Sequence, residues 1–490
     1  MDPSREKVFM SREASIREAM RVIDQGGLAI SLVVDAERGL LGTVTDGDIR
    51  RAILAGVDLD GPVEKVMNVA PLTVTPGTDM QEIRRIFVDS LVKHVPVVDG
   101  SGRVTDLLTI SEFLTVPLST PDITSSEVEA VLAVLRTPNL SLGPKVIEFE
   151  RRVAECAQRE FAVAVNSGTS GLHLIVRSLG LTEGDEVITT PFSFIASSNC
   201  LLYERVTPVF VDIDPDTYNL DPSLVEAAIT PRTRAILAVD VFGQPADYDV
   251  LDDIARRHGL ALISDCCESI GAEFKGRRAS TYGAAGVFAF YPNKQITTGE
   301  GGAVITDDPE IARLCRSMRN QGRGDADGWT VHERLGYNYR LPDVSCAIGI
   351  AQLARIDDIL ARRDQAAQMY NAALAEVPGV FVPYIAPSTT RMSWFVYVLR
   401  LGDEYTREQR DQVAEYMRQH GIGVATYFSP IHLQSFYREQ FGFDEGDFPV
   451  TEHVASHTLS LPFHNNLAES DCDLVVDHLR SALEDVVQGR

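Results

Sequence analysis

A strand runs into a helix at residues 164–176, AVNSGTSGLHLIV, through a turn of small polar residues. The apolar run predicts a strand that ends at Val165, and the pattern after the turn predicts a helix that begins with Leu172. The turn between them consists of Ser167, Gly168, Thr169 and Ser170. Unpaired amides at a helix N-terminus, together with the helix dipole, form a phosphate site. Taken alone, however, such a turn more often only caps its helix.

Apolar runs of the same kind alternate with helix-length segments up to about residue 375. In order, they read FAVAV, EVITT, PVFVDI, RAILAVDV, ALISD and GVFAF. Short buried strands separated by helices predict a mainly parallel sheet that is covered on both faces. The remainder, 376–490, combines the strand pattern WFVYVLRL with the helix pattern REQRDQVAEYMRQHG. We therefore predict a large α/β domain over 120–375 and a smaller α+β domain over 376–490.

The first 115 residues contain an internal repeat whose two copies are 64 residues apart. Val33-Val34-Asp35 recurs as Val97-Val98-Asp99, Thr45 recurs as Thr109, and Asp48 corresponds to Glu112. Each copy follows the order helix, strand, glycine turn, strand and helix start. Two such units that bury their sheets together would form one compact α/β domain over 1–116. The prolines and polar residues of TVPLSTPDI, 115–123, then predict a linker.

The composition of the chain indicates which kinds of protein it can be. With 490 residues, 44% of them hydrophobic and 23% charged, the chain is typical of a soluble protein with two or three domains. A formal net charge of -25 argues against a nucleic-acid partner, because phosphate backbones need a basic face. The sequence has no apolar stretch of about 18 residues, so no membrane span is expected. The seven cysteines lack metal-binding CxxC spacing, and we expect a cytoplasmic protein without a metal site.

Two further residues stand where predicted strands end. Asp265 closes the run ALISD, and α/β proteins bind ligands at this end of parallel strands. Lys294 lies between the strand GVFAF and the glycine turn TTGEGG, a setting that would bury its amine and suit it to form a Schiff base. Separately, Asp265 also fits a helix cap and Lys294 a solvated surface residue. Together with the phosphate turn, they suit pyridoxal phosphate (PLP), whose ring nitrogen pairs with an acid.

The chain after the linker resembles the DegT/DnrJ/EryC1/StrS family of sugar aminotransferases, which have an aspartate-aminotransferase-type fold. The resemblance is carried by NSGTSGLHL, GDEVITTPFSFIAS, PVFVDIDPDTYNLD, YPNKQITTGEGGAV, GYNYRLPDVSCAIGIAQL and SPIHLQSFY. It covers residues 120–490 and implies PLP as the cofactor. By this resemblance, Lys294 is the lysine that binds PLP, and Asp265 is the partner of the pyridinium nitrogen.

The resemblance also assigns the remaining cofactor contacts. Thr169 and Ser170 would hold the phosphate, and Phe194 would stack on the ring. Two positions depart from the family pattern. Ala289 stands where serine is common, so one hydroxyl contact to the phosphate is either missing or supplied by another group. Glu268 stands where Gln or His is common, and its carboxylate would orient the phenolic oxygen of PLP only if it were protonated or bridged.

A third group of residues concerns the partner subunit and the substrate. Asn338 and Arg340 lie in the segment GYNYR, which in the family reaches the cofactor site of the neighbouring subunit. The resemblance therefore implies a homodimer or a higher oligomer with shared sites. His432, in SPIHLQ, is a candidate contact for the sugar nucleotide, and a structural role for it is equally expected.

The implied reaction transfers an amino group from glutamate to a nucleotide-linked keto-sugar, and family analogy favours a 4-keto-6-deoxy sugar. Lys294 would carry the proton as general base and acid. One alternative is a PLP-binding regulator without turnover, but intact Lys294 and Asp265 favour an enzyme. The other is a PLP-dependent sugar dehydratase. Relatives that dehydrate sugars carry histidine in place of the lysine, so Lys294 argues against this alternative.

Residues 1–116 resemble a CBS pair, also called a Bateman module. The stretch GTVTDGDIRR matches the pattern G-x-x-T-x-x-D, in which Thr45 and Asp48 would contact a ribose and Arg50 and Arg51 would meet phosphates. In the second copy Glu112 replaces the ribose-binding aspartate, so we expect one adenine-nucleotide site in the pair. The alternative is a docking or dimerisation module without a ligand.

Overall fold

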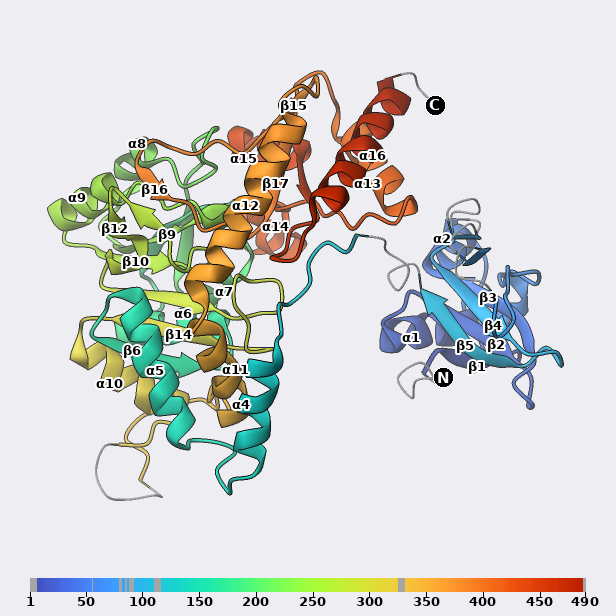
Figure 1. Cartoon of the computed structure of the whole chain (residues 1–490), viewed down its shortest axis with the longest axis horizontal. Coiled ribbons are helices and arrows are strands. Elements are labelled where there is room, and N and C mark those ends of the chain that lie inside the picture. The colour runs from blue at the N-terminus through green and yellow to red at the C-terminus, as the bar shows by residue number, and fades with distance from the viewer. Residues whose placement is uncertain are drawn as a thin grey trace. The chain divides into compact units, whose positions relative to one another are not determined.

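The computed structural model describes residues 7–54, 56–78, 82–83, 86–87, 92–109, 116–324 and 331–487. The chain divides into two compact units (Figure 1). The smaller unit comprises Met1–Pro117 with Tyr416–Gly423, and the larger unit comprises Leu118–Glu415 with Val424–Arg490.

A seven-stranded sheet forms the centre of the larger unit (Figure 1). Its strands, in spatial order, are β6 (Phe161–Val165), β14 (Gly302–Thr306), β13 (Ala285–Ala289), β10 (Ala261–Asp265), β9 (Thr233–Val239), β7 (Glu186–Thr189) and β8 (Thr207–Phe210). All neighbouring pairs are parallel except those of β14, which is antiparallel to both β13 and β6. The six apolar runs seen in the sequence all form strands of this sheet, and the mainly parallel arrangement is confirmed.

Helices cover both faces of this sheet, as strand β6 illustrates. Val163 and Val165 belong to one buried cluster, with residues of α6 (Gly168–Ser178) and α10 (Pro309–Arg319). Ala162 and Ala164 belong to another cluster, with residues of α5 (Pro144–Ala157). Since side chains alternate between the faces of a strand, the strand must be apolar throughout when both faces are buried.

Helix α6 begins at Gly168, one turn earlier than the sequence pattern predicts. The predicted start at Leu172 is wrong because the small polar residues of the turn are themselves helical. Ser167 is the N-cap: its backbone is extended, with φ -165° and ψ 160°, and its side chain accepts a hydrogen bond from the amide of Ser170. Side-chain capping of this kind satisfies one of the free amides of the first turn.

The C-terminal part of the larger unit contains a small antiparallel sheet of β15 (Val380–Phe381), β17 (Tyr397–Leu401) and β18 (Thr458–Leu461). The long helix α12 (Ile356–Leu374) connects the region of the large sheet with this part (Figure 1). It contacts the last helix, α16 (Glu469–Val487). The predicted strand and helix patterns form β17 and α13 (Arg407–Gln419), so the mixed α+β character is observed.

The strands of the smaller unit repeat with the spacing seen in the sequence. Strands β2 (Ile30–Val34) and β3 (Leu40–Thr45) form a hairpin, and β4 (His94–Val98) and β5 (Val104–Thr109) form another at positions 64 residues later. Both hairpins shift register at equivalent positions, between Val33 and Val34 and between Val97 and Val98. In the first copy, helix α1 (Ile16–Gly26) packs on the sheet and α2 (Asp46–Leu54) follows β3.

Within the residues that the structure describes, no helix has both the length and the apolar character needed to cross a membrane.

Candidate active site

A cavity of about 480 Å³ lies in the larger unit at the carboxyl edge of the sheet. Val239, Asp265 and Ala289, the last residues of the parallel strands β9, β10 and β13, all line it. This edge is where open α/β sheets bind ligands, because the loops that follow the strands spread apart there. Seven of the predicted site residues line the cavity: Ser167, Gly168, Thr169, Phe194, Asp265, Glu268 and Lys294.

The carboxylate of Asp265 is buried and fixed from two sides. Its Oδ2 accepts a hydrogen bond of 2.8 Å from the hydroxyl of Ser197, and its Oδ1 accepts one of 3.1 Å from the amide of Cys267. The Asp265 residue is only 4% exposed. An ionised carboxylate can accept about four hydrogen bonds, so capacity remains for a donor in the cavity.

The amine of Lys294 lies against an aromatic ring and a carboxylate in the cavity wall. Its Nζ lies 3.7 Å from the centroid of the Phe395 ring and 3.4 Å from Oε1 of Glu268. Burial raises the pKa of Glu268, and the positive charge of Lys294 opposes this rise. The sequence predicted that the lysine would be partly buried next to the glycine turn, but it did not predict the pair with Glu268.

The N-terminus of α6 forms another wall of the cavity. Ser167, Gly168 and Thr169 line it, whereas Ser170 is buried behind them and shares a hydrogen bond with the hydroxyl of Ser167. A Cβ atom at Gly168 would come within 2.8 Å of Cys267 Sγ and 2.9 Å of the Ala289 side chain. Only glycine therefore lets these segments approach, and the helix start remains open to an anion.

The chemistry of these groups fits PLP. The cofactor needs an anion site for its phosphate, an acid for its ring nitrogen and an amine for its aldehyde. The cavity presents a helix N-terminus, Asp265 and Lys294 for these three needs. A polar atom without a partner also lies on its wall: Oδ1 of Asn293 is buried and makes no hydrogen bond within the described part of the chain. Phe194, predicted to stack on the ring, lines the cavity with 61% of its surface exposed.

Asn338 and Arg340 are not among the residues that line this cavity in the single chain. Arg340 donates a hydrogen bond of 3.1 Å to the side chain of Asn320, and the backbone of Asn338 bridges that of the same residue. Their position away from the cavity agrees with the prediction that this segment serves a neighbouring subunit, which stays a prediction.

The two tyrosines of the same GYNYR segment belong to a hydrogen-bonded cluster that includes His173 of helix α6. The Tyr339 hydroxyl lies 3.1 Å from Nδ1 of His173 on α6. Nε2 of His173 lies 2.7 Å from Glu204, which also accepts a hydrogen bond of 3.2 Å from Tyr337. Burial lowers the pKa of His173, although Glu204 opposes this. The cluster links the segment to the middle of helix α6.

His432 does not reach the cavity. The residue has no exposed surface, its Nε2 lies 3.0 Å from Glu452, and its ring packs against Phe448. These contacts fit the structural role, and the substrate contact stays a prediction.

Several residues that line the cavity were not among the predicted site residues. They are Ser193, Ser197, Asn293, Phe395, Tyr427 and Phe428. Ser193 and Ser197 stand four residues apart and hydrogen-bond each other, so they form one short relay that ends on Asp265. The spacing of the two serines in FSFIASS is compatible with a hydrogen bond between them on a helix. It does not indicate that Ser197 also bonds to Asp265, 68 residues away.

In the smaller unit, the predicted nucleotide residues bond with one another. Oδ2 of Asp48 accepts hydrogen bonds from the amide and the hydroxyl of Thr45, at 2.8 and 2.7 Å. Oδ1 of Asp48 pairs with Arg51 at 2.6 Å, and Arg50 is exposed. Glu112 lies outside the described residues, so the contrast between the two copies stays a prediction.

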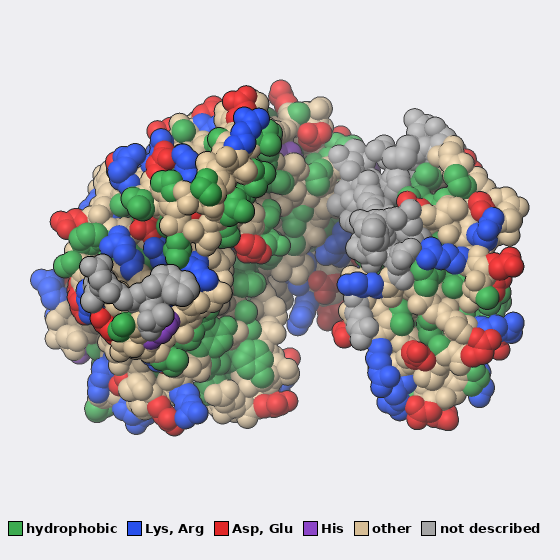
Figure 2. Space-filling model, turned by 90° about the horizontal axis from the view of Figure 1, so that it is seen from below, with side chains coloured by type: hydrophobic (Ala, Val, Ile, Leu, Met, Phe, Trp, Pro, Cys, Tyr) green, Lys and Arg blue, Asp and Glu red, His purple; other side chains and the backbone are tan. Residues whose placement is uncertain are grey.

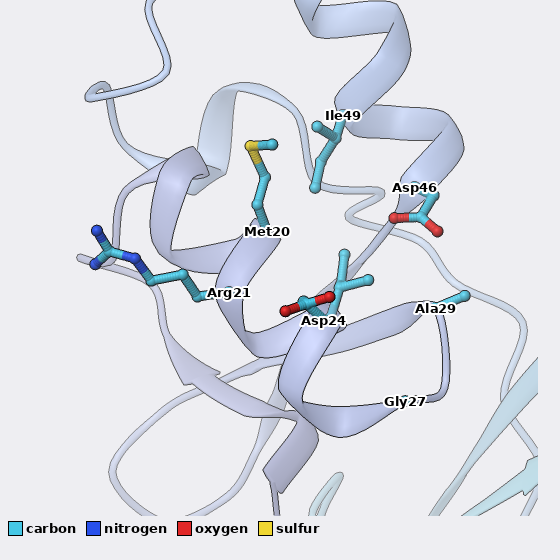
Figure 3. Close-up of a pocket in the computed structure, with 8 residues that line it drawn as sticks. Met20, Arg21, Asp24, Gly27, Ala29, Asp46 and Ile49 are labelled. Atoms are coloured by element: carbon cyan, nitrogen blue, oxygen red, sulfur yellow. The ribbon is translucent and has the colours of Figure 1, made fainter. Parts of the chain in front are cut away.

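A cavity of about 620 Å³ lies beside these residues, between α1 and α2. Figure 3 shows Met20 and Asp24 of α1 and Asp46 and Ile49 of α2 around it, whereas Arg21 extends to the opposite side from Asp46. Neither Thr45 nor Asp48 is among its lining residues. The wall therefore combines apolar side chains with the two carboxylates of Asp24 and Asp46 and one guanidinium, that of Arg21.

Three potential metal ligands lie together elsewhere in the larger unit. Ligand atoms of Asp403, His453 and His457 are within 4.8 Å of one another. Both ring nitrogens of His457 already lie within 2.9 Å of carbonyl oxygens, those of His453 and Tyr405, and Asp403 pairs with Arg400. These contacts compete with an ion, and the expectation of no metal site stays a prediction.

Comparison with known proteins agrees with this arrangement. Residues 121–480 match the DegT/DnrJ/EryC1/StrS aminotransferase family, and residues 3–55 and 63–119 match the CBS domain. The GDP-perosamine synthase of Caulobacter vibrioides is 36% identical over 376 residues, which cover 76% of this chain and 100% of that protein.

Two solved structures show the same likeness. DesV of S. venezuelae is 36% identical, with a TM-score of 0.70 over 75% of this chain and 98% of its own. The PLP form of the putative sugar aminotransferase Spr1654 from Streptococcus pneumoniae is 27% identical, with a TM-score of 0.72 over 76% of this chain and 99% of its own.

The predicted fold, the CBS pair, the enzyme class of a PLP-dependent aminotransferase and the cofactor are confirmed at this level. Since the match spans nearly all of the chain after the linker, this protein belongs to the DegT/DnrJ/EryC1/StrS aminotransferase family.

Proposed function

We propose that the protein transfers an amino group from glutamate to a nucleotide-linked keto-sugar, and that the acceptor is a 4-keto-6-deoxy sugar. The observation that carries this proposal is the convergence of Lys294, Asp265 and the N-terminus of α6 on one cavity. Similarity to a GDP-perosamine synthase supports a nucleotide-linked sugar as the acceptor. Glutamate as the donor rests on family analogy.

The cavity walls would hold PLP by three contacts. The first turn of α6, with Thr169 and the nearby Ser170, would bind the phosphate. Phe194 would lie against the ring, and Asp265 would accept the hydrogen bond of the ring nitrogen. When bound, PLP supplies an electron sink that stabilises negative charge on the substrate carbon. Ser197 and the Cys267 amide keep the Asp265 carboxylate in place for this role.

Lys294 would move the proton in this reaction. Its Nζ would take a proton from the substrate carbon as a general base and return it as a general acid. The contacts with Phe395 and Glu268 hold the amine in a defined position, so little orientation must be achieved during the reaction.

A homodimer would complete the site. The GYNYR segment of a second copy would bring Asn338 and Arg340 to the cavity. Helix α4 (Ser125–Leu135) supports such an interface, because Val128, Leu132 and Leu135 are exposed on it at helical spacing. Figure 2 shows that hydrophobic side chains gather on one face of the larger unit. Exposed apolar patches of this kind mark protein interfaces.

The CBS pair would regulate the enzyme by binding one adenine nucleotide at Thr45 and Asp48, with Arg50 near its phosphates. The internal contacts of Asp48 would have to rearrange for this. The alternative is a docking module that binds no nucleotide.

We also propose that the chain is organised into three domains: the CBS pair at 1–116, the PLP-binding domain at 120–375 and the small C-terminal domain at 376–490. The seven cysteines are unpaired, which fits a cytoplasmic location.

A panel of nucleotide-linked keto-sugars tests the function. Purified protein loaded with PLP is incubated with glutamate and each sugar, and the products are identified by mass. An amino sugar and an equal amount of 2-oxoglutarate are expected for a 4-keto-6-deoxy sugar. A dehydrated product would favour the dehydratase alternative, and PLP binding without turnover of any sugar or of glutamate would favour the regulator.

A further inference from the structure

The carboxylate of Glu268 is held between the active-site lysine and a backbone amide. Its Oε1 lies 3.4 Å from Nζ of Lys294, and its Oε2 accepts a hydrogen bond of 2.9 Å from the amide of Phe242. The residue is 5% exposed. Both carboxylate oxygens therefore face a donor: Oε1 faces the amine of Lys294, which the proposed reaction uses, and Oε2 faces the amide of Phe242.

The backbone amide that donates to Glu268 belongs to Phe242, which lies in a strained turn. Phe242 has a positive φ of 56°, and Gly243 follows with a φ of 94°. A bulky residue rarely adopts such a backbone, so the surrounding structure must hold it there. A Cβ at Gly243 would lie 1.7 Å from the carbonyl oxygen of Ser393, which shows how closely the turn is packed. The turn directs an N–H group at a buried carboxylate.

The backbone of Glu268 is fixed independently of its side chain. The side-chain amide of Gln295 donates hydrogen bonds to the backbone carbonyl oxygens of Glu268 and Ser393, at 2.5 and 3.0 Å. Gln295 is the residue after Lys294, so the segment that carries the lysine also holds the segment that carries the carboxylate. The pair is therefore built into two connected segments rather than formed by two free side chains.

The two donors that face this side chain favour a carboxylate over the glutamine or histidine that is common at this position. The ammonium group of a lysine and the N–H of Phe242 are both donors, so each needs an acceptor. A glutamine has one acceptor oxygen and would turn its NH₂ group towards one of the two donors. A carboxylate accepts from both and also neutralises a buried positive charge, which would otherwise be costly.

We propose that Glu268 is the proton-holding partner of Lys294, a positioning residue that takes a proton from Nζ when the amine must be neutral and returns it when the lysine must act as an acid. In the forward step an N–H bond breaks, an O–H bond forms on Oε1, and the electron pair stays on the nitrogen. Burial raises the pKa of Glu268 and so favours its protonated form, while the charge of Lys294 opposes this. This inference rests on the proposed aminotransferase function.

The test compares Glu268→Gln with Glu268→Asp and with a surface control, Glu310→Gln. Glu310 is an exposed carboxylate that pairs with Arg313 on α10, outside the cavity. Each protein is loaded with PLP, and the absorbance of the lysine-bound cofactor is titrated with pH in the absence of substrate. Loss of a carboxylate beside the nitrogen removes the group that favours its protonated form. Glu268→Gln should therefore lower the midpoint by about 1–3 pH units, and Glu310→Gln should leave it unchanged.

Glu268→Asp keeps the charge on a side chain one methylene shorter, so it should restore most of the wild-type midpoint. This variant also serves if the glutamine protein does not fold, because a smaller shift in the same direction is still expected. A midpoint that is equal in wild type and both Glu268 variants would overturn the proposal. So would a shift of the same size in Glu310→Gln.

A second measurement uses the protein without PLP. The rate at which an amine-directed acylating reagent modifies Lys294 is followed against pH by peptide mass spectrometry. Glu268→Gln should make the amine reactive at lower pH, by a similar margin. This result does not depend on turnover, so failure of the inference is distinguished from failure of the proposed function, for which wild-type protein would give no 2-oxoglutarate.

Discussion

The two units of the chain each contain a cavity, and the smaller of the two cavities has the clearer chemistry. The 480 Å³ cavity of the larger unit is surrounded by a lysine, three carboxylates and a helix N-terminus, which come from separate segments at one edge of a sheet. The 620 Å³ cavity of the smaller unit is lined by α1, α2 and the loop between α1 and β2. Volume alone does not indicate a ligand, whereas polar groups that converge from several elements do.

The two sites also differ in how their carboxylates are used. Asp265 is fixed by Ser197 and Cys267 and keeps acceptor capacity towards its cavity. Both carboxylate oxygens of Asp48 already accept hydrogen bonds from Thr45 and Arg51, which lie in the same short segment. We therefore expect changes in the first site to abolish chemistry and changes in the second to alter only regulation.

The largest effect is expected from Lys294→Ala. The variant should lose both the absorbance of lysine-bound PLP and all turnover, because no other described amine lies in the cavity wall. Absorbance spectra of the loaded protein and a glutamate assay check this. A variant that keeps full activity would remove Lys294 from the site.

Asp265→Asn should retain PLP but lose several orders of magnitude in rate. The amide nearly matches the carboxylate in size, so the fold should persist, but it no longer keeps the ring nitrogen protonated. Single-turnover rates with glutamate measure the loss, and circular dichroism checks the fold. A rate near that of the wild type would place the required acid elsewhere.

A mixture of two inactive variants tests the shared site. Lys294→Ala and Arg340→Ala should each be inactive, and refolding them together should restore about a quarter of the wild-type activity. Half of the dimers are then hybrids, and each hybrid has one intact site. The amount of restored activity is read against each variant refolded alone. An active monomer in sedimentation would contradict the dimeric site.

The smallest effect is expected from the CBS pair. Removal of residues 1–116 should leave a folded enzyme with basal activity, since the predicted PLP residues all lie beyond the linker. Calorimetry with AMP, ATP and S-adenosylmethionine should find one site per CBS pair, lost in Asp48→Ala. Coupling to the active site would amount to about 1–3 kcal/mol and would act in both directions. Unchanged binding to Asp48→Ala, or no binding at all, would favour a docking module.

The sequence predicted those features of the fold and site that have a local pattern. The six apolar runs form strands, the repeat spacing recurs in both hairpins, and Asp265 and Lys294 line the same cavity. The start of α6 was missed because the capping residue, Ser167, lies before the apolar pattern begins. Contacts between distant segments have no such pattern.

The pair of Glu268 and Lys294 is one such contact, since it depends on how the loops after β10 and β13 pack. The burial of His432 is another, because Glu452 and Phe448, which surround it, lie in a later segment. A histidine in a recognisable motif therefore gave no information on whether it reaches the cavity.

The amino-donor half of the reaction can be measured without any sugar and reports directly on whether the protein is an aminotransferase. Wild-type protein loaded with PLP is mixed with glutamate in the absence of any sugar, and both the absorbance and 2-oxoglutarate are followed. We predict that the absorbance of lysine-bound PLP disappears as one 2-oxoglutarate forms per site, and that Lys294→Ala shows neither change. Loaded wild-type protein that binds glutamate but forms no 2-oxoglutarate would show that it does not transfer the amino group of glutamate.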